Sequence, residues 1–371
     1  MAPQIDPPWR FDPLQNPVNV SWGGGPGFVT ATGNFHGEGT VGHMFDKDGA
    51  VIGTFSNVGF EGTGADGLPL SITIESSAAT SDGKFMFGGY NVNSVLSSYS
   101  GPTLIKEEPG GGSVWGSNNG VGGDATTISY VRSTNDGGCY SAYVSVSDGV
   151  VNEALQKFNK DGGLVWSRPA PPSGSQVFLC TTPNGKFVVF GQSPNLTCYD
   201  ENGMVVWVQS VSFLAISIGA ANDGFALIGG DRSGVSKYNI QTGGLVWSTG
   251  IDIGSAIDIA RDGSVFVVTV SGADASLTKL DSKSGTTVWS ISVPSTEDFG
   301  SVRGVVAPGG FVSVGIESQH LVSHEDLTTD TTYTVSTYDQ ATASLQWTYT
   351  YGHLPPEGGT QSTLESLGRS P

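Results

Sequence analysis

One pattern recurs along most of this chain: a glycine followed four positions later by a tryptophan. The hexapeptide GGLVWS occurs in identical form at 162–167 and at 243–248. The wider pattern Gly-x-x-x-Trp, with Ala343 in place of the glycine in its last copy, contains six of the eight tryptophans: Trp115, Trp166, Trp207, Trp247, Trp289 and Trp347. The period is roughly 40 residues with insertions, which is typical of four-stranded propeller blades and not of helical solenoids. A seventh, degenerate copy is DKDGAVIGTF, where Gly53 takes the tryptophan position.

A second marker, a tight turn followed by an apolar run, precedes each copy. The unit that begins at Ala256 shows the arrangement: AIDIA, the turn RDG, SVFVVTV, SLTKLD, the turn SKSG, and TTVWSISV. Short apolar or alternating runs separated by glycine-containing turns predict antiparallel strands joined in sequence order. Gly is frequent, at 55 residues, and charged residues are only 13% of the chain, a balance that also favours strands over amphipathic helices.

A single four-stranded meander exposes two apolar faces, so neighbouring units must pack face to face and close into a ring. We therefore predict an all-β chain that forms a single seven-bladed β-propeller of four-stranded antiparallel blades over residues 17–352. Residues 1–16 and 353–371 are predicted to be extended N- and C-terminal arms. The expected blades are 17–58, 68–118, 126–170, 175–212, 213–251, 254–294 and 301–352. Each blade is complete within its own segment, which predicts closure by packing, with a swapped terminal strand as the alternative.

Three of the tryptophan segments carry a resemblance to a known repeat. YNIQTGGLVW (238–247), LDSKSGTTVW (280–289) and YDQATASLQW (338–347) resemble the repeat of the pyrroloquinoline-quinone-type (PQQ-type, or quinoprotein-like) β-propellers, roughly Asp-x-x-Thr-Gly-x-x-x-Trp. FNKDGGLVW and YDENGMVVW are one residue shorter in the turn, and the first blade lacks its tryptophan. The resemblance implies that each tryptophan docks flat between neighbouring blades and that the Thr-Gly turn holds a strand pair. It indicates architecture more than activity.

The resemblance also raises the question of a cofactor. In the quinoprotein dehydrogenases a tryptophan stacks on the cofactor, acidic and amide groups hold calcium, and some members have a vicinal disulfide. This chain has no adjacent cysteines and no haem-attachment motif. We therefore expect no cofactor, no catalytic residues and no enzymatic activity. For the six tryptophans we predict structural docking, with stacking on a sugar or a cofactor as the alternative for one of them.

The charge balance and the cysteines limit the partners. With 16 Lys and Arg against 34 Asp and Glu, the formal net charge is −18, which argues against nucleic-acid binding. No apolar run reaches about 18 residues, and the proline-rich start lacks the regions of a signal peptide, so no membrane insertion is expected. Cys139, Cys180 and Cys198 match no metal-ligand spacing and are predicted to be buried free thiols.

Candidate metal ligands are few. DKDG (46–49), NKDG (159–162) and DENG (200–203) look like the beginnings of calcium loops but lack the later ligand positions, so hairpin turns are the preferred interpretation. His320 and His324 are four positions apart beside Glu325, where a helical turn could present both imidazoles to zinc. A third ligand is not evident, so a solvated loop between the second and third strands of the last blade is preferred. We predict no metal site.

Function is expected to lie in the segments that do not repeat: 1–16, 56–69, 101–112, 317–333 and 352–371. Loops on one rim of a rigid ring are where propellers usually bind partners. The sequence favours a structural and interaction protein, a virion component that decorates a bacteriophage capsid or belongs to its tail and contacts other protein subunits or a host-surface glycan or protein. The expected location is then the virion or the extracellular space, with cytoplasm or periplasm as alternatives. A ligand-, glycan- or metal-binding propeller and an intracellular scaffold are the alternative functions.

Overall fold

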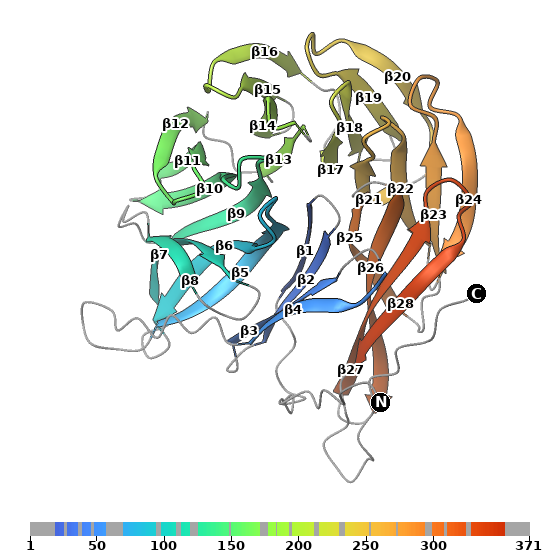
Figure 1. Ribbon diagram of the computed structural model, residues 1–371, viewed down its shortest axis with the longest axis horizontal. Coiled ribbons are helices and arrows are strands. Elements are labelled where there is room, and N and C mark those ends of the chain that lie inside the picture. Colours follow the sequence, from blue (N-terminus) through green and yellow to red (C-terminus); the bar gives the residue numbers. More distant parts are fainter. Residues whose placement is uncertain are drawn as a thin grey trace.

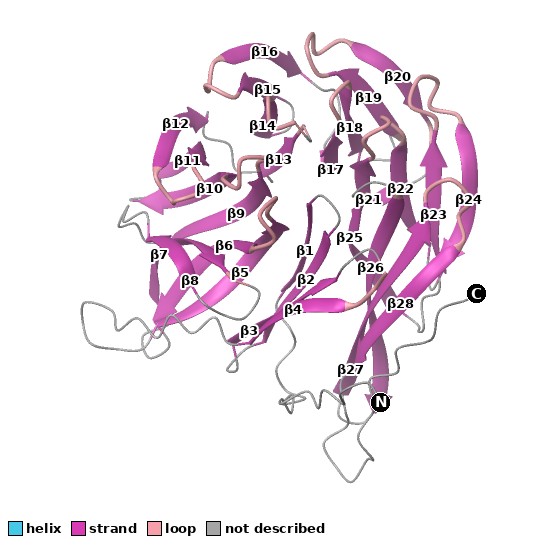
Figure 2. Ribbon diagram, viewed as in Figure 1, coloured by secondary structure: helices cyan, strands magenta, loops and turns pink. Residues whose placement is uncertain are grey.

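The computed structural model consists of β-strands and turns, and none of the residues it describes is helical (Figures 1 and 2). Among the described residues, there is no helix long and apolar enough to span a membrane. The structure describes the backbone of residues 19–352 except for 26–27, 36–38, 46–47, 57–69, 94–97, 109–112, 119–124, 148–149, 171–176, 183, 193–194, 211–214, 230–233, 252–253, 272–273, 294–298, 308–309 and 324–327. The predicted arms, 1–16 and 353–371, lie outside the described residues.

The strands form four-stranded antiparallel sheets, each built from consecutive strands in sequence order. The first sheet contains β1 (Asn19–Gly25), β2 (Phe28–Phe35), β3 (Gly39–Phe45) and β4 (Val51–Ser56). The next contains β5 (Leu70–Ala79), β6 (Phe85–Asn93), β7 (Ser98–Glu107) and β8 (Ser113–Asn118). It is followed by β9 (Ala125–Ser133), β10 (Cys139–Ser147), β11 (Val150–Phe158) and β12 (Leu164–Ala170).

The second half of the chain repeats this arrangement. One sheet contains β13 (Val177–Thr181), β14 (Phe187–Gln192), β15 (Asn195–Asp200) and β16 (Val205–Ser210). The next contains β17 (Ala215–Ala220), β18 (Gly224–Gly229), β19 (Val235–Asn239) and β20 (Leu245–Thr249). Then come β21 (Gly254–Ile259), β22 (Val265–Ser271), β23 (Asp274–Leu280) and β24 (Thr287–Val293). The last sheet contains β25 (Phe299–Val306), β26 (Phe311–Ser323), β27 (Thr328–Asp339) and β28 (Leu345–Gly352).

The sheets are arranged as the blades of a propeller, with the first strand of each sheet at the centre (Figure 1). Each first strand contacts the first strand of the next sheet, from β1 and β5 round to β21 and β25, and β25 in turn contacts β1. The ring is therefore closed by packing of the last blade against the first. No strand is exchanged between sheets among those described, so the swapped-strand alternative is not the arrangement found.

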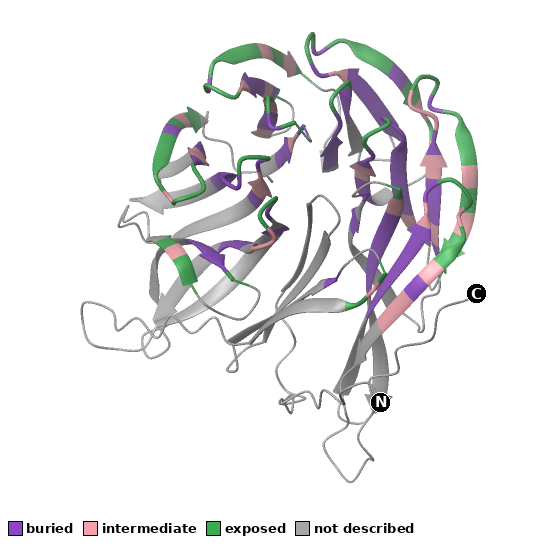
Figure 3. Ribbon diagram, viewed as in Figure 1, coloured by how far each residue is buried: buried purple, intermediate pink, exposed green. Residues whose placement is uncertain are grey.

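The hydrophobic core lies between neighbouring blades. One cluster combines Val189 and Leu196 of the β13–β16 sheet with Ile218 and Phe225 of the β17–β20 sheet. Another joins Phe45 of the first sheet to Val335 and Trp347 of the last. Figure 3 shows the consequence: among the residues whose burial is described, strands such as β22 are largely buried, while outermost strands such as β16 and β24 are mostly exposed or intermediate. Burial of apolar area between blades is thus what holds the ring together.

The turns between third and fourth strands follow the sequence pattern. In the turn after β19, Gly243 adopts a φ of 70°, which is the left-handed conformation that favours glycine. Ala343 occupies the equivalent position after β27 and has a φ of 60°, the one positive φ among the described residues that are not glycine. The imperfect last copy of the repeat therefore keeps the same backbone at some cost in strain.

Candidate interaction surface

The tryptophans of the repeat connect each blade to the next. Five of them donate a hydrogen bond from indole Nε1 to a backbone carbonyl oxygen in the turn between the third and fourth strands of the following blade. The pairs are Trp115 to Lys160 (2.8 Å), Trp166 to Glu201 (3.0 Å), Trp207 to Ile240 (2.7 Å), Trp247 to Ser282 (3.1 Å) and Trp289 to Gln340 (3.2 Å). The polar end of each indole is thus satisfied within the ring, which leaves it no free donor for a ligand.

The glycine of each repeat has a role that the sequence did not reveal. The ring of Trp207 lies against Gly243 of the next blade, so closely that a β-carbon on this glycine would lie 2.9 Å from the indole. The same contact joins Trp115 to Gly162, Trp166 to Gly203, Trp247 to Gly285 and Trp347 to Gly49. Since Gly49 belongs to the first blade, the contact with Trp347 closes the ring. The glycine therefore shapes its own turn and also receives the tryptophan of the preceding blade.

A lysine position directly across from the tryptophan was missed by the sequence analysis. Lys106, Lys157, Lys237 and Lys279 on the third strands are the register partners of Trp115, Trp166, Trp247 and Trp289. Lys157 donates to the carbonyl oxygen of Glu201 at 3.0 Å, and Lys279 donates to that of Gln340 at 2.9 Å. Each of these carbonyls belongs to the following blade and also accepts the indole N–H. The signal was present as a lysine nine or ten positions before the tryptophan, but its partner lies in another blade.

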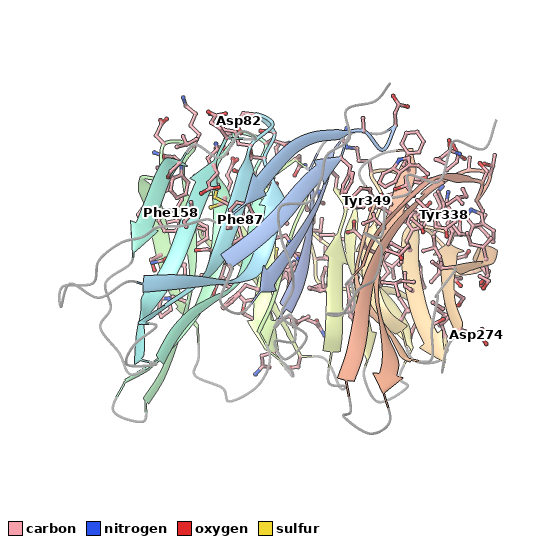
Figure 4. The ribbon with its side chains drawn as sticks, turned by 90° about the horizontal axis from the view of Figure 1, so that it is seen from below. Asp82, Phe87, Phe158, Asp274, Tyr338 and Tyr349 are labelled. Atoms are coloured by element: carbon pink, nitrogen blue, oxygen red, sulfur yellow. The ribbon has the colours of Figure 1, made fainter. Side chains whose placement is uncertain are left out.

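Lys237 has the most extensive set of contacts. Its Nζ lies 3.1 Å from Oδ2 of Asp223 in its own blade, and it donates to the carbonyl oxygens of Gly263 (2.9 Å) and Ser282 (3.0 Å) in the next. Lys106 repeats the arrangement with Asp82 at 2.9 Å and Gly137 at 2.6 Å. Both lysines are almost completely buried. The turns between first and second strands and the turns between third and fourth strands therefore lie on the same rim of the ring. Asp82, in a turn between a first and a second strand, is labelled in the side view of Figure 4.

The acidic turns act as turns. Oδ1 of Asp200 accepts the backbone N–H groups of Asn202 (2.9 Å) and Met204 (2.8 Å). Oδ1 of Asn159 does the same for Asp161 and Gly163. The preferred hairpin interpretation is therefore confirmed for these two turns, because the first side chain of each turn stabilises it through backbone hydrogen bonds.

His320 does not lie on the loop that the sequence predicted. His320 lies within strand β26, paired in register with Asp330 of β27, because the long insertion extends the hairpin instead of leaving it. The prediction of a solvated loop is therefore wrong at His320, and His324 lies outside the described residues. Among the described residues, no group of three or more His, Cys, Asp or Glu is arranged to hold a metal ion.

The cysteines are buried and unpaired, which confirms their predicted state. Burial raises the pKa of the Cys139 and Cys180 thiols above their ordinary range and that of Cys198 to about 12. The thiolate form is therefore scarce near neutral pH, and these residues act as small apolar side chains.

One carboxylate on an inner strand has a shifted pKa. Asp258 of β21 is half-buried and accepts a hydrogen bond from the backbone N–H of Ala307 at 2.8 Å. Burial raises its pKa to about 6, although hydrogen bonds from Ala307 and Ile259 and the charge of Arg132 act in the opposite direction. Arg132 lies on the inner part of another blade, so these two charges interact across blades at the centre of the ring.

The outermost strands expose apolar side chains. Eight of these side chains lie in or beside β12, β16 and β20 of three successive blades: Leu164, Val165, Met204, Val205, Val206, Val208, Leu245 and Val246. Met204 and Val208 are 67% and 62% exposed. Apart from Arg168 in β12, the outer strands β4, β8, β12, β16, β20, β24 and β28 contain no charged residue. Edge strands are commonly protected by charges, and these are not.

Comparison with known proteins supports the repeat assignment. A family model described as outer membrane protein assembly factor BamB, of the PQQ repeat class, matches residues 213–324. Over these residues the chain is similar to the PQQ-type β-propeller repeat. The outer membrane protein assembly factor BamB of Yersinia pestis is 29% identical over 165 residues, covering 38% of this chain and 39% of that protein. This chain therefore matches about two-fifths of the length of that relative.

Two solved structures are among those to which this chain is similar. BamB from Moraxella catarrhalis is 10% identical with a TM-score of 0.47, covering 91% of this chain and 96% of that one. A protein of unknown function from Bacteroides caccae is 14% identical with a TM-score of 0.46, covering 72% of this chain and 94% of that one. At these values neither structure indicates what the present chain binds.

Proposed function

We propose that this protein is a non-enzymatic interaction scaffold that binds other protein subunits of a larger assembly. The observation that carries the proposal is the row of exposed apolar side chains on outer strands in which Arg168 is the one charged residue; Met204 and Val208 are the most exposed. Exposed apolar residues concentrated on one region of a soluble ring are typical of protein contact surfaces. The name of the Yersinia relative, an assembly factor, is consistent with this role.

The absence of catalysis is part of the proposal. The tryptophans that could stack on a cofactor donate their N–H groups within the ring, and the acidic turn residues accept backbone hydrogen bonds. Absorbance spectra and metal analysis of the purified protein test this directly. A bound chromophore or a stoichiometric metal would overturn it.

A location in the cell envelope is the proposal that the names of the relatives favour, and it corresponds to the periplasmic alternative of the sequence analysis. The comparisons give no support to the virion component that the sequence favoured. A virion component would also be a subunit of a larger assembly, as proposed above. Fractionation of the producing cells, followed by immunodetection, separates the two. Recovery with particles and not with the envelope would restore the virion hypothesis.

We also infer that the ring has seven blades, since the inner strands form a closed circuit from β1 through β5, β9, β13, β17, β21 and β25 back to β1. An experimental density map viewed down the ring axis would count the blades. A six-fold or eight-fold pattern would contradict the inference.

The scaffold function is tested by in vivo cross-linking and identification of the linked proteins. Full-length protein is compared with a variant that lacks residues 1–16 and 353–371. If the predicted arms hold the assembly, the truncated protein remains folded and loses its cross-links. If the outer strands hold it, the cross-links persist. Failure of the full-length protein to cross-link to any partner would count against the scaffold.

A further inference from the structure

We propose that outer strand β16 binds an additional β-strand from a different protein, an extended segment with alternating apolar side chains and positively charged flanks. This inference rests on the proposed scaffold function and names the site and the chemistry of the partner.

The backbone of β16 has one free edge. Its inner edge pairs antiparallel with β15, in a register that runs from Asn195 opposite Ser210 to Cys198 opposite Trp207. The strand order of this sheet ends at β16, and no other described strand pairs with it. Along the free edge, alternate N–H and C=O groups face outward, and an extended peptide can satisfy them by joining the sheet.

The side chains favour β16 over the other outer strands. Trp207 is held by the next blade, so Val208, its neighbour along the strand, faces the opposite way and is 62% exposed. Met204, Val205 and Val206 extend the apolar row toward the turn. In β12, by contrast, Arg168 and Pro169 interrupt the strand, and both residue types discourage pairing.

Charge favours a different protein over a second copy of this chain. The formal net charge is −18, so two copies brought together at their edges repel each other, whereas a basic segment is attracted. The turn that leads into β16 contains Asp200 and Glu201. Two cations that contact this turn, Lys157 and Arg168, donate to the backbone carbonyl oxygens of Glu201 and Gly203. The carboxylates at this end therefore suit a cationic flank on the incoming segment.

The test uses synthetic peptides and the full-length protein. The probe is a labelled peptide of alternating valine and threonine between lysine flanks. Its matched versions carry N-methyl groups on alternate backbone amides, or glutamate flanks in place of lysine. Fluorescence anisotropy gives the dissociation constants. We expect N-methylation to weaken binding by about tenfold or more, and glutamate flanks to weaken it at low ionic strength.

Two matched variants locate the site. Val208→Lys places a charge on the free edge of β16 and is expected to weaken the lysine-flanked probe by about tenfold or more. Val288→Lys is the control, since Val288 is 54% exposed on β24, another uncharged outer strand. It should leave the dissociation constant unchanged. Thermal unfolding of both variants verifies that each is folded, as expected for substitutions at exposed positions.

Each other outcome overturns the proposal. Equal loss in both variants, or in neither, would show that β16 is not the site. Equal binding of the N-methylated probe would show an apolar contact without strand addition. Self-association of the wild-type protein that Val208→Lys abolishes would identify a second copy as the occupant. If Val208→Lys retains the cellular cross-links, the scaffold function stands and this site for it is wrong.

Discussion

At the scale of single residues, the repeat works through three side-chain positions that act on the neighbouring blade. The glycine has no β-carbon, so the indole of the preceding blade packs against it, and the tryptophan donates one hydrogen bond to a backbone carbonyl oxygen. In four blades a lysine donates a hydrogen bond to a turn of the next blade.

The contact between Gly243 and Trp207 is testable by adding one methyl group. Gly243→Ala introduces both an unfavourable φ and a β-carbon only 2.9 Å from the indole. Gly83→Ala is the control, because Gly83 has a φ of 75° and a β-carbon there would have no neighbour within 4 Å. We expect Gly83→Ala to lower the free energy of unfolding by about 1–2 kcal/mol, and Gly243→Ala to cost about 1–3 kcal/mol more. Urea denaturation measures both, and equal losses would contradict the packing role.

The buried ammonium of Lys237 is expected to stabilise the ring. Lys237→Met leaves the carbonyl oxygens of Gly263 and Ser282 without this donor, which should lower the free energy of unfolding by about 2–4 kcal/mol. Lys283→Met, at an exposed position on the same rim, serves as the control and should change stability by less than about 0.5 kcal/mol. A small effect at both positions would show that water replaces the lysine without cost.

Asp258 gives stability a pH dependence of known sign. Because burial raises the folded-state pKa to about 6, above its ordinary value, protonation favours the folded state. The contribution is complete below about pH 4 and is lost as the pH rises through about 6. Asp258→Asn removes the titrating carboxyl group and with it this dependence of stability on pH. We expect the stability of wild type relative to the variant to fall between pH 4 and pH 7, as measured by urea unfolding at each pH, and a constant difference would contradict the shifted pKa.

At the scale of elements, the turns between third and fourth strands come in two lengths with one mechanism. In the longer turn, Oδ1 of Asn239 accepts the backbone N–H groups of Gln241 (2.9 Å) and Thr242 (3.0 Å). Asp281 and Asp339 do the same in the following blades. The hydrogen bonds to Asp281 and Asp339 hold the pKa of each carboxyl below its ordinary value. The first residue of the turn thus accepts backbone hydrogen bonds that stabilise the turn before the outer strand.

Replacing that residue tests the turn as an element. Asn239→Ala is expected to lower the free energy of unfolding by about 1 kcal/mol, because the backbone N–H groups of Gln241 and Thr242 lose the side-chain oxygen and bind water in its place. Asn239→Asp should retain most of it, because aspartate occupies the same position in two other blades. Chemical denaturation and hydrogen exchange of β20 report the effect. A loss in Asn239→Asp as large as in Asn239→Ala would contradict the acceptor role.

At the scale of the whole molecule, stability depends on closing the ring between the last and first blades. Trp347 performs this closure by packing on Gly49 and Phe45, with its ring centroid 5.5 Å from that of Phe45. Elsewhere in the ring, Trp247 makes the equivalent contact with Gly285. The two tryptophans are equally exposed, at 7%, so they form a matched pair.

Removing each tryptophan should therefore have different consequences at a distance. Trp347→Ala and Trp247→Ala are each expected to cost about 3–5 kcal/mol through lost packing. Only Trp347→Ala should increase hydrogen exchange in both β1 and β25, because it opens the contact between the chain's first and last blades. Mass spectrometry of exchanged peptides measures this. Equal exchange in the two variants would show that closure does not depend on Trp347.

What the sequence determined by itself is the repeating unit. The spacing of Gly-x-x-x-Trp and the turn signals predicted four consecutive antiparallel strands per blade, because period and turn chemistry are local properties of the chain. The contacts that each repeat makes with other blades follow only from the tertiary structure. The partners of Lys237 in another blade, the glycine face beneath each tryptophan, the strand position of His320 and the exposure of Val208 all depend on the packing of neighbouring blades or on an extended hairpin. These contacts join residues distant in sequence, and no local pattern specifies them.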